Sequence, residues 1–465
     1  MGVYPGSQVV VGLSDLSEPL EAAGLIEGQD FYARKEFASA LKIFRPLAEQ
    51  GNALAACYLG LMYEYGQCLE QNVTEAARWF HVAAKQGDAR AQNNLGLKYA
   101  TGSGVSQSDQ EALKWFRSSA DQGYALAQNN LGVMYEKGQG TEQDYVQAVG
   151  LYRAAAEQGN ALAQNNLGWM YANGHGVPQD HHEAVRLYRL SSEQGNALAQ
   201  NNLGWMYANG HGVAQDYKES VRWYRLAVEQ GNALAQTNLG VMYANGRGVP
   251  QSDEEAVKRY RLGAELGNAF AQGNLGWVYA NGRGVPQSDE EAVKWYRLSA
   301  DQGNATAQRN LGWMYANGQG IERDYVQAVK WYRLSADQGN GVAQTNLGVM
   351  YANGRGVSKD YLEAVKWYRL GADQGNTTAQ RNLGWMFEKG HGVAVENVVA
   401  YALYELAQVG DALNGSKAKA SLGRLEAEMS AHELVVARHL ASEMDAPGGV
   451  LTALDEYLNC GNRLV

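Results

Sequence analysis

The sequence predicts an all-α protein, a right-handed α-solenoid of ten 36-residue helix–loop–helix repeats with capping helices at its two ends. The dipeptide Leu-Gly recurs every 36 residues without insertion or deletion, and within each unit apolar residues follow helical spacing until glycines interrupt them. The ten copies begin at Leu59, Leu95, Leu131, Leu167, Leu203, Leu239, Leu275, Leu311, Leu347 and Leu383. Because a two-helix hairpin cannot bury both of its apolar stripes alone, the units are expected to stack.

The unit from Asn160 to Gly195 shows how one repeat is built. Its first apolar stripe has the spacing i, i+4, i+7, i+8 of a single helix face and consists of Ala163, Leu167, Met170 and Tyr171. Gly174 and Gly176 end this helix, because glycine adopts the left-handed conformation without steric cost. Asp180 is suited to cap a second helix. The second stripe consists of Ala184, Tyr188 and Ser191 or Ser192.

These columns resemble the Sel1-like repeats, a family related to the tetratricopeptide repeat. The family pattern Ala…Leu-Gly…Tyr…Gly-x-Gly…Ala…Trp/Tyr…Ala-Ala…Gly is carried by Ala163, Leu167, Gly168, Tyr171, Gly174, Gly176, Ala184, Tyr188, Gly195 and their copies. The resemblance covers about three quarters of the chain. It departs in the first unit, where Cys68 replaces the second loop glycine, and in the tenth, where Phe387 replaces tyrosine and Glu405 replaces arginine. The closing segment after the repeats is similar to that of bacterial members.

The segments that flank the repeats are predicted to cap the ends of the solenoid. The expected organisation is a disordered segment at 1–17, a degenerate capping repeat at 18–51, the repeats at 52–411, capping helices at 412–446 and a tail at 447–465. The register ends before the last cap, because Leu422-Gly423 lies 39 residues after the preceding Leu-Gly. Ser430 and Glu433 are spaced as a capping box, and a short helix is expected near 450–458.

The face of the first helix opposite its apolar stripe is the candidate binding surface. At 100° per residue, Leu162, Asn165 and Trp169 lie roughly opposite Leu167. In the family that the sequence resembles, this face lines a concave groove. Trp and Arg dominate protein-binding hot spots, so the surface is predicted to bind another protein or a peptide segment. The candidate residues are Trp169, Trp205, Trp277, Trp313, Trp385, Asn165, Asn201, Arg309, Arg381, Leu162, Leu198 and Phe270.

Other interpretations of these columns remain open. The tryptophans could instead fill space between neighbouring first helices, and Arg309 and Arg381 could stack on the tryptophans four residues later. An asparagine column that runs from Asn94 to Asn382 fits an inter-repeat hydrogen-bond ladder better than a ligand site. In the second helix, a column of arginines precedes acidic residues by four positions, which predicts an ion-pair ladder on a solvated face. The second-helix tryptophans are predicted to be packing residues.

The sequence favours a non-enzymatic scaffold or adaptor without metal or cofactor. His175 and His211 lack further ligands at metal-binding spacing, and the repeated Gly-x-Gly lies between helices rather than after a strand. Cysteine-rich members of the resembled family are linked with β-lactam binding and hydrolysis, and the chain has S-x-x-K matches at Ser39 and Ser416. Partner motifs S-D-N and K-T-G are missing, however, as are regular cysteine pairs. Self-assembly into a structural array is the other alternative.

Composition bounds the compartment and the partners. A net charge of −10 argues against nucleic acid, and no apolar run is long enough for membrane insertion. Cys57, Cys68 and Cys460 are expected to be free thiols, with a Cys57–Cys68 bridge as the alternative. The N-terminus lacks the pattern of a signal peptide, so a cytoplasmic location is expected, or a secreted or periplasmic one if a leader was removed. A monomer is favoured.

Overall fold

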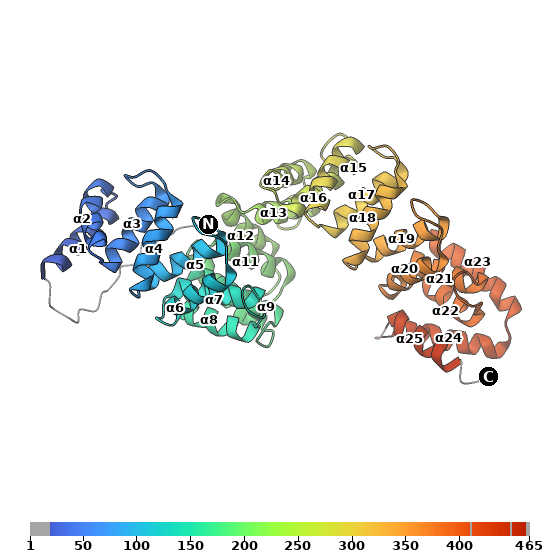
Figure 1. Cartoon of the computed structure of the whole chain (residues 1–465). Coiled ribbons are helices and arrows are strands. Elements are labelled where there is room, and N and C mark those ends of the chain that lie inside the picture. Colours follow the sequence, from blue (N-terminus) through green and yellow to red (C-terminus); the bar gives the residue numbers. More distant parts are fainter. Residues whose placement is uncertain (1–18, 410–411, 447–448, 462–465) are drawn as a thin grey trace. The chain divides into compact units, whose positions relative to one another are not determined.

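The computed structural model describes residues 19–409, 412–446 and 449–461, and the regular elements of these residues are all α-helices (Figure 1). The chain divides into two compact units, one that extends to Asp216 and one that begins at Tyr217. The first unit contains α1 (Pro19–Ala33), α2 (Phe37–Glu49), α3 (Ala53–Tyr65), α4 (Val73–Lys85), α5 (Ala89–Thr101), α6 (Asp109–Ala120), α7 (Ala125–Lys137), α8 (Tyr145–Glu157), α9 (Ala161–Asn173), α10 (His181–Glu193) and α11 (Ala197–Asn209).

The second unit contains α12 (Tyr217–Glu229), α13 (Ala233–Asn245), α14 (Asp253–Glu265), α15 (Ala269–Asn281), α16 (Asp289–Asp301), α17 (Ala305–Asn317), α18 (Tyr325–Asp337), α19 (Gly341–Asn353), α20 (Tyr361–Asp373), α21 (Thr377–Lys389), α22 (Asn397–Ala407), α23 (Ala412–Glu428), α24 (Ala431–Asp445) and α25 (Gly449–Gly461). We call the odd-numbered helices α3 to α21 helix A, and the even-numbered helices α4 to α22 helix B. Each pair of one helix A and the following helix B forms one predicted repeat.

Side-chain caps fix where the repeat helices begin. Asn160 accepts a hydrogen bond from the Ala163 amide at 2.9 Å at the start of α9, and Asp180 accepts from the His182 and Glu183 amides at 2.9 and 3.0 Å at the start of α10. These bonds satisfy N–H groups that have no partner within the helix. The predicted role of Asp180 as an N-cap is confirmed.

Two glycines of the repeat are required by close contacts, and only the first repeat lacks the second of them. Gly168 lies where helix A meets helix B, and a Cβ there would be 2.9 Å from Cε1 of Tyr188. Gly176 has φ +69°, and its Cβ would be 2.4 Å from the carbonyl oxygen of Tyr145 in the preceding helix B. Cys68, which replaces this second glycine in the first repeat, still adopts φ 59°. The loop conformation is therefore set by the fold rather than by glycine alone.

Apolar side chains from both helices of a repeat form its core. Leu167 and Met170 of α9 and Tyr188 of α10 are all buried, as the apolar stripes predict. The buried phenols stay protonated, since burial raises the pKa of Tyr224 and of Tyr260 to about 12. The tryptophans of helix B are also packing residues, because they are buried or half-buried.

The arginine column of helix B connects successive repeats, which corrects the prediction of an ion-pair ladder. Arg189 Nη2 donates to the hydroxyl of Tyr207 in the next helix A at 3.0 Å instead of pairing with Glu193. The same bond joins Arg117 to Tyr135, Arg153 to Tyr171, Arg225 to Tyr243, Arg261 to Tyr279, Arg297 to Tyr315 and Arg333 to Tyr351. An arginine placed before an acid is the less favourable i,i+4 order, whereas the tyrosine hydroxyl is held in place by packing.

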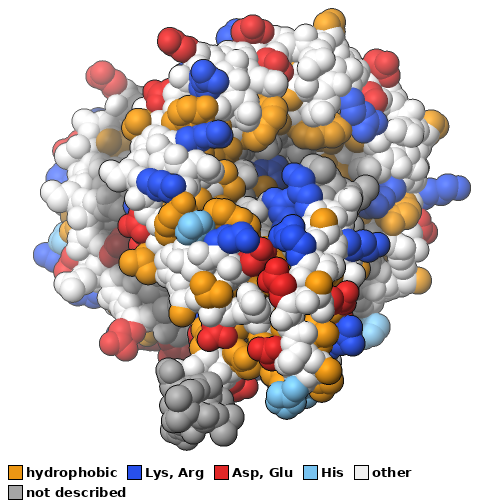
Figure 2. Space-filling model, turned by 90° about the vertical axis from the view of Figure 1, so that its right-hand side faces the viewer, with side chains coloured by type: hydrophobic (Ala, Val, Ile, Leu, Met, Phe, Trp, Pro, Cys, Tyr) orange, Lys and Arg blue, Asp and Glu red, His pale blue; other side chains and the backbone are white. Residues whose placement is uncertain are grey.

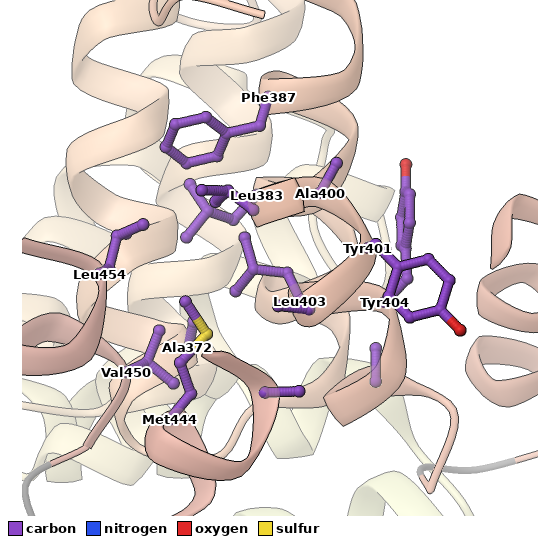
Figure 3. Packing of buried hydrophobic residues seen from close by; sticks show 14 of the residues in the cluster. Ala372, Leu383, Phe387, Ala400, Tyr401, Leu403, Tyr404, Met444, Val450 and Leu454 are labelled. Carbon is purple, nitrogen blue, oxygen red and sulfur yellow. The ribbon is translucent and has the colours of Figure 1, made fainter. Parts of the chain in front are cut away.

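Helices also cover the two ends of the repeat array. At the first end, α1 and α2 pack beside α3, and Phe44 stacks on Tyr58 with 4.6 Å between ring centroids. At the other end, Leu403, Met444 and Leu454 come together from α22, α24 and α25, while Tyr401 and Tyr404 lie on the far side of α22 (Figure 3). The segment 1–17, expected to be disordered, lies outside the described residues.

The remaining sequence predictions concern single residues. Ser430 and Glu433 form the predicted capping box at the start of α24. Cys57 is buried and Cys68 is exposed, and both are free thiols, so the alternative of a bridge between them is wrong. The short helix expected near 450–458 is α25, which is longer at both ends.

Candidate interaction surfaces

The tryptophans of helix A are partly exposed in both units. In the first unit, Trp169 is 37% exposed and Trp205 is 45% exposed. In the second unit, Trp277, Trp313 and Trp385 are exposed to a similar extent. These rings belong to helix A but lie outside the core of their repeat.

Each of several tryptophans contacts the middle residue of the Gly-x-Gly loop that follows it. The His175 ring lies 5.0 Å from the Trp169 ring and stacks on Tyr145 of the preceding helix B at 4.7 Å. In the next repeat, His211 lies 5.1 Å from Trp205 and 4.9 Å from His181. The loop residue thus restrains one side of the indole, while the rest of the ring remains open to a partner.

In the second unit this loop position holds three arginines, one glutamine and one histidine. His391 lies 4.7 Å from Trp385 and stacks on Tyr361 at 4.4 Å. Arg283 lies over Trp277 at 5.6 Å and pairs with Asp253 at 2.8 Å. A helical wheel of helix A does not reveal this contact, although the histidines and arginines between the loop glycines are a signal for it.

The leucines and the phenylalanine predicted for the surface are exposed as well. Leu162 and Leu198 lie about two turns before the tryptophan of the same helix. Phe270 is the most exposed residue of the set at 61%. We call these residues and the five tryptophans the helix-A surface. Helices α9, α11, α15 and α17, which carry four of these tryptophans, contain no Asp or Glu, whereas α21, which carries Trp385, contains Glu388. Outside α21 the surface is therefore apolar with little charge.

Two predicted site residues do not contribute to an open surface. Asn165 and Asn201 are only 6% and 3% exposed. Asn165 Oδ1 accepts a hydrogen bond from Asn202 Nδ2 at 3.0 Å, and Asn129 accepts from Asn166 in the same way. The predicted inter-repeat asparagine ladder is therefore confirmed in the first unit, and Asn165 takes part in it instead of facing solvent.

The predicted arginines are half-buried and bonded to a neighbouring amide. Arg309 Nη2 donates to Oδ1 of Asn310 at 2.6 Å, and Arg381 Nη2 donates to Oδ1 of Asn382 at 2.9 Å. For Arg309, this bond replaces the stacking on Trp313 that the i,i+4 spacing allowed. Its position nonetheless places a cation beside the helix-A surface of the second unit.

A second kind of surface lies on helix B. A cavity of about 310 Å³ is bounded by α10 and the loop residues Gly212 and Val213, and a cavity of about 360 Å³ is bounded by α20 and Leu451 of α25. Acidic and basic side chains are interspersed on the face of the molecule seen in Figure 2, with hydrophobic side chains between them.

Metal-binding groups and membrane-spanning helices are both absent from the described part of the chain. No group of three or more His, Cys, Asp or Glu residues there could hold a metal ion, and no helix there is long and apolar enough to cross a membrane. Ser39 and Lys42 lie on α2, and Ser416 and Lys419 lie on α23, all in the capping helices.

The repeats match a known family in every copy. The Sel1 repeat pattern is found at residues 53–88, 89–124, 125–160, 161–196, 197–232, 233–268, 269–304, 305–340, 341–376 and 377–407. The chain belongs to the Sel1 repeat family. These matches cover well over half of this Sel1 repeat protein, and they begin and end close to the boundaries that the Leu-Gly period predicts.

One solved structure similar to this Sel1 repeat protein supports the same conclusion. A protective antigen present in uropathogenic Escherichia coli strains, described as displaying an SLR fold, is 36% identical with a TM-score of 0.65; the match covers 96% of this chain and 95% of that one. A Sel1 repeat protein from Oxalobacter formigenes is 35% identical over 52% of this chain and 96% of its own, with a TM-score of 0.47. No curated protein matches the sequence.

Proposed function

We propose that this Sel1 repeat protein is a non-enzymatic scaffold that binds a protein segment on its helix-A surface. Proteins built from Sel1 repeats generally act as protein-interaction scaffolds, and the family membership supports the same role here. The observation that carries the proposal is the repeated exposure of a tryptophan whose ring is already held by a loop histidine or arginine. A restrained aromatic ring loses little conformational freedom on binding, which favours its use as an anchor.

The chemistry of the surface indicates the kind of segment it would bind. Around Trp169 and Trp205, the exposed neighbours are Leu162 and Leu198, and the two helices carry no charged residue. A segment with apolar anchors therefore fits this part of the surface. In the second unit, Arg309 adds a positive charge, which favours an acidic residue beside the apolar anchors there.

The test is to remove tryptophans from each unit and to compare binding with stability. The pairs Trp169→Ala with Trp205→Ala, and Trp277→Ala with Trp313→Ala, are each used as bait in affinity capture followed by mass spectrometry. Proteins captured by the wild type should be lost with one or both pairs, while the melting temperature changes by only a few degrees because the rings are partly exposed.

Leu298→Ala is the matched control, since Leu298 is equally exposed but lies on helix B. It should capture the same proteins as the wild type. If the tryptophan pairs lower the melting temperature steeply while capture is unchanged, the tryptophans are packing residues and the proposal is wrong.

A further inference from the structure

The last helix of the chain shows how a helix B of this protein binds another helix. Near the start of α25, the backbone N–H of Leu451 donates to Oδ1 of Asp373 in α20 at 3.0 Å. One turn later, Asp455 pairs with Arg369 of α20. The Leu451 side chain lies at the cavity whose other lining residues are Leu362, Val365, Lys366, Arg369 and Leu370. The carboxylate of Asp373, the guanidinium of Arg369 and the apolar side chains around Leu451 thus hold α25 on α20.

The same residue pattern is found on every helix B from α10 to α20, and on α10, five repeats earlier, it again lines a cavity. Each residue of α20 at this site has a counterpart exactly five periods of 36, or 180 positions, before it in the sequence. Val185, Arg189 and Leu190 are identical to their counterparts, while Arg186 and Glu193 keep the charges of theirs. The lining of the cavity on α10 consists of His182, Val185, Arg186, Arg189, Leu190, Glu193, Gly212 and Val213. The described residues that line it come from α10 and from the loop after α11.

Two differences separate the two sites, and the first is that the exposed His182 stands where α20 has Leu362. Arg189 already donates through Nη2 to the hydroxyl of Tyr207, whereas the residue eighteen positions after Arg369 is Phe387, which has no hydroxyl. A guanidinium group has five N–H donors, so Arg189 can bind a carboxylate and keep its tyrosine. The exposed carboxylate of Glu193 takes the place of Asp373 as an acceptor for the N–H groups at the start of a helix.

We propose that the surface of α10 around Arg189 binds an amphipathic helix of a partner protein, with an aliphatic residue in its first turn and an acidic residue four positions later. This is the pattern of Leu451 and Asp455 in α25. The α25 helix of a second copy is the less favourable occupant, because Val450 and Leu454 are buried in the core of their own chain and would be exposed on leaving it. The site is separate from the helix-A surface.

The test uses a peptide with the sequence of α25 as the probe. An acetylated peptide of residues 449–459 with a fluorescent label is titrated with the full chain, and binding is followed by fluorescence anisotropy. We expect saturable binding that weakens about tenfold in the Arg189→Ala chain, and equally with the Asp455→Asn peptide, since each change removes the same charged hydrogen bond. The Glu193→Gln chain should also bind more weakly.

Arg153→Ala is the matched control. Arg153 donates to Tyr171 as Arg189 does to Tyr207, so both variants lose one bond of the same ladder. In α8, however, Gly150 and Ala154 stand where α10 has Arg186 and Leu190, so Arg153→Ala should leave peptide binding unchanged. Absence of saturable binding, or an equal loss with Arg153→Ala, would overturn the proposal.

Two further variants locate the peptide. Helices α12, α14, α16 and α18 also have an arginine and an acidic residue at the corresponding positions, Arg333 and Asp337 in α18, and α20 has its own site. Binding that is lost with Arg333→Ala or Arg369→Ala but kept with Arg189→Ala places the peptide elsewhere and overturns the proposal. The proposal is also overturned if light scattering detects a dimer of the wild-type chain that is lost in Arg189→Ala, because the helix bound at α10 then belongs to a second copy. The Trp205→Ala chain should bind normally, so this test is independent of the proposed function.

Discussion

Arg369 of α20 forms an ion pair with Asp455 of α25 at the position where seven earlier repeats bond the corresponding arginine to a tyrosine hydroxyl. The eighteenth residue after Arg369 is Phe387, whose ring lacks the hydroxyl. The arginine that cannot continue the ladder is thus the one that holds the closing helix. The replacement of tyrosine by Phe387 in the tenth repeat thus coincides with the point where the arginine binds the capping helix α25 instead of the next repeat.

The first prediction concerns this ion pair. Asp455→Asn should loosen α25 from α20, with a loss of about 1 kcal/mol in the free energy of unfolding, because Asp455 is largely exposed and its pairing is partly screened. Hydrogen exchange measured by mass spectrometry should become faster in residues 449–461 and stay unchanged in the first unit. Glu456→Gln, at the exposed neighbouring position, is the control. Unaltered exchange in Asp455→Asn would show that apolar contacts alone hold α25.

The second prediction separates two roles of glycine. Gly159 and Gly176 both have positive φ, but a Cβ at Gly159 has no atom within 4 Å, whereas a Cβ at Gly176 is 2.4 Å from a backbone oxygen. Gly159→Ala should therefore cost about 1 kcal/mol from backbone strain alone. Gly176→Ala should cost about 3 kcal/mol, because the loop must also move away from α8. Urea unfolding followed by circular dichroism measures the free energy of unfolding of both variants. Equal losses would contradict a role for the close contact between Gly176 and the Tyr145 carbonyl oxygen.

The sequence predicts the repeat helices well because their signals are local and repeated ten times. The caps, the loop glycines and the apolar stripe of α9 and α10 all follow from the spacing within one unit. Residues at the boundary between units are harder to predict. A helical wheel places Asn165 opposite the core of its own repeat, but the next helix A covers it and Asn202 bonds to it.

The i,i+4 spacing wrongly predicts ion pairs for the arginines of helix B for the same reason. It considers residues of one helix, whereas the partner of Arg189 is Tyr207 in the next repeat. The docking of α25 on α20 has no precedent within the repeats, so periodicity cannot predict it. The one local signal is Phe387, which marks where the ladder of arginine and tyrosine ends. The exposure of Trp169 and Trp205 was also undecided from the sequence, because a wheel does not show whether a neighbouring helix covers an indole.

The third prediction concerns a buried ion pair in the first unit. Lys98 occupies the column that holds Met170 and its copies, and its buried ammonium group pairs with Glu64 of the preceding helix A. In Glu64→Ala the Lys98 ammonium group keeps Ser103 Oγ as a hydrogen-bond partner at 3.2 Å. Because the buried charge then lacks its counter-ion, the free energy of unfolding should fall by about 3 kcal/mol. Adding Lys98→Met should restore the lost stability or exceed it, since both positions then match the fourth repeat.

The measurement is the midpoint of chemical unfolding of the wild type, Glu64→Ala and the double variant. Lys98→Met alone is the control, because the remaining carboxylate of Glu64 still reaches solvent. A double variant that is no more stable than Glu64→Ala would show that the cost comes from lost packing rather than from the unpaired charge.

The fourth prediction concerns pH and the carboxylate of Glu388 in α21. Although burial alone would raise its pKa, hydrogen bonds from Lys389 and Tyr404 and the charge of Arg424 lower the pKa below its ordinary value of 4.5. A carboxyl group whose pKa is lower in the folded state stabilises the fold above its unfolded pKa. This contribution is lost as the pH falls through the folded value.

Glu388→Gln should therefore lower the free energy of unfolding near pH 7 by about 1 kcal/mol and make it less dependent on pH below 4.5. Urea unfolding at pH 7, 5, 4 and 3 would measure this, with the curves of wild type and variant converging at the acid end. Glu428→Gln, on the exposed side of α23, is the control and should keep the wild-type profile. A constant difference between Glu388→Gln and wild type at every pH would mean that the amide fits poorly, and that the charge of Glu388 contributes nothing to the attachment of α23.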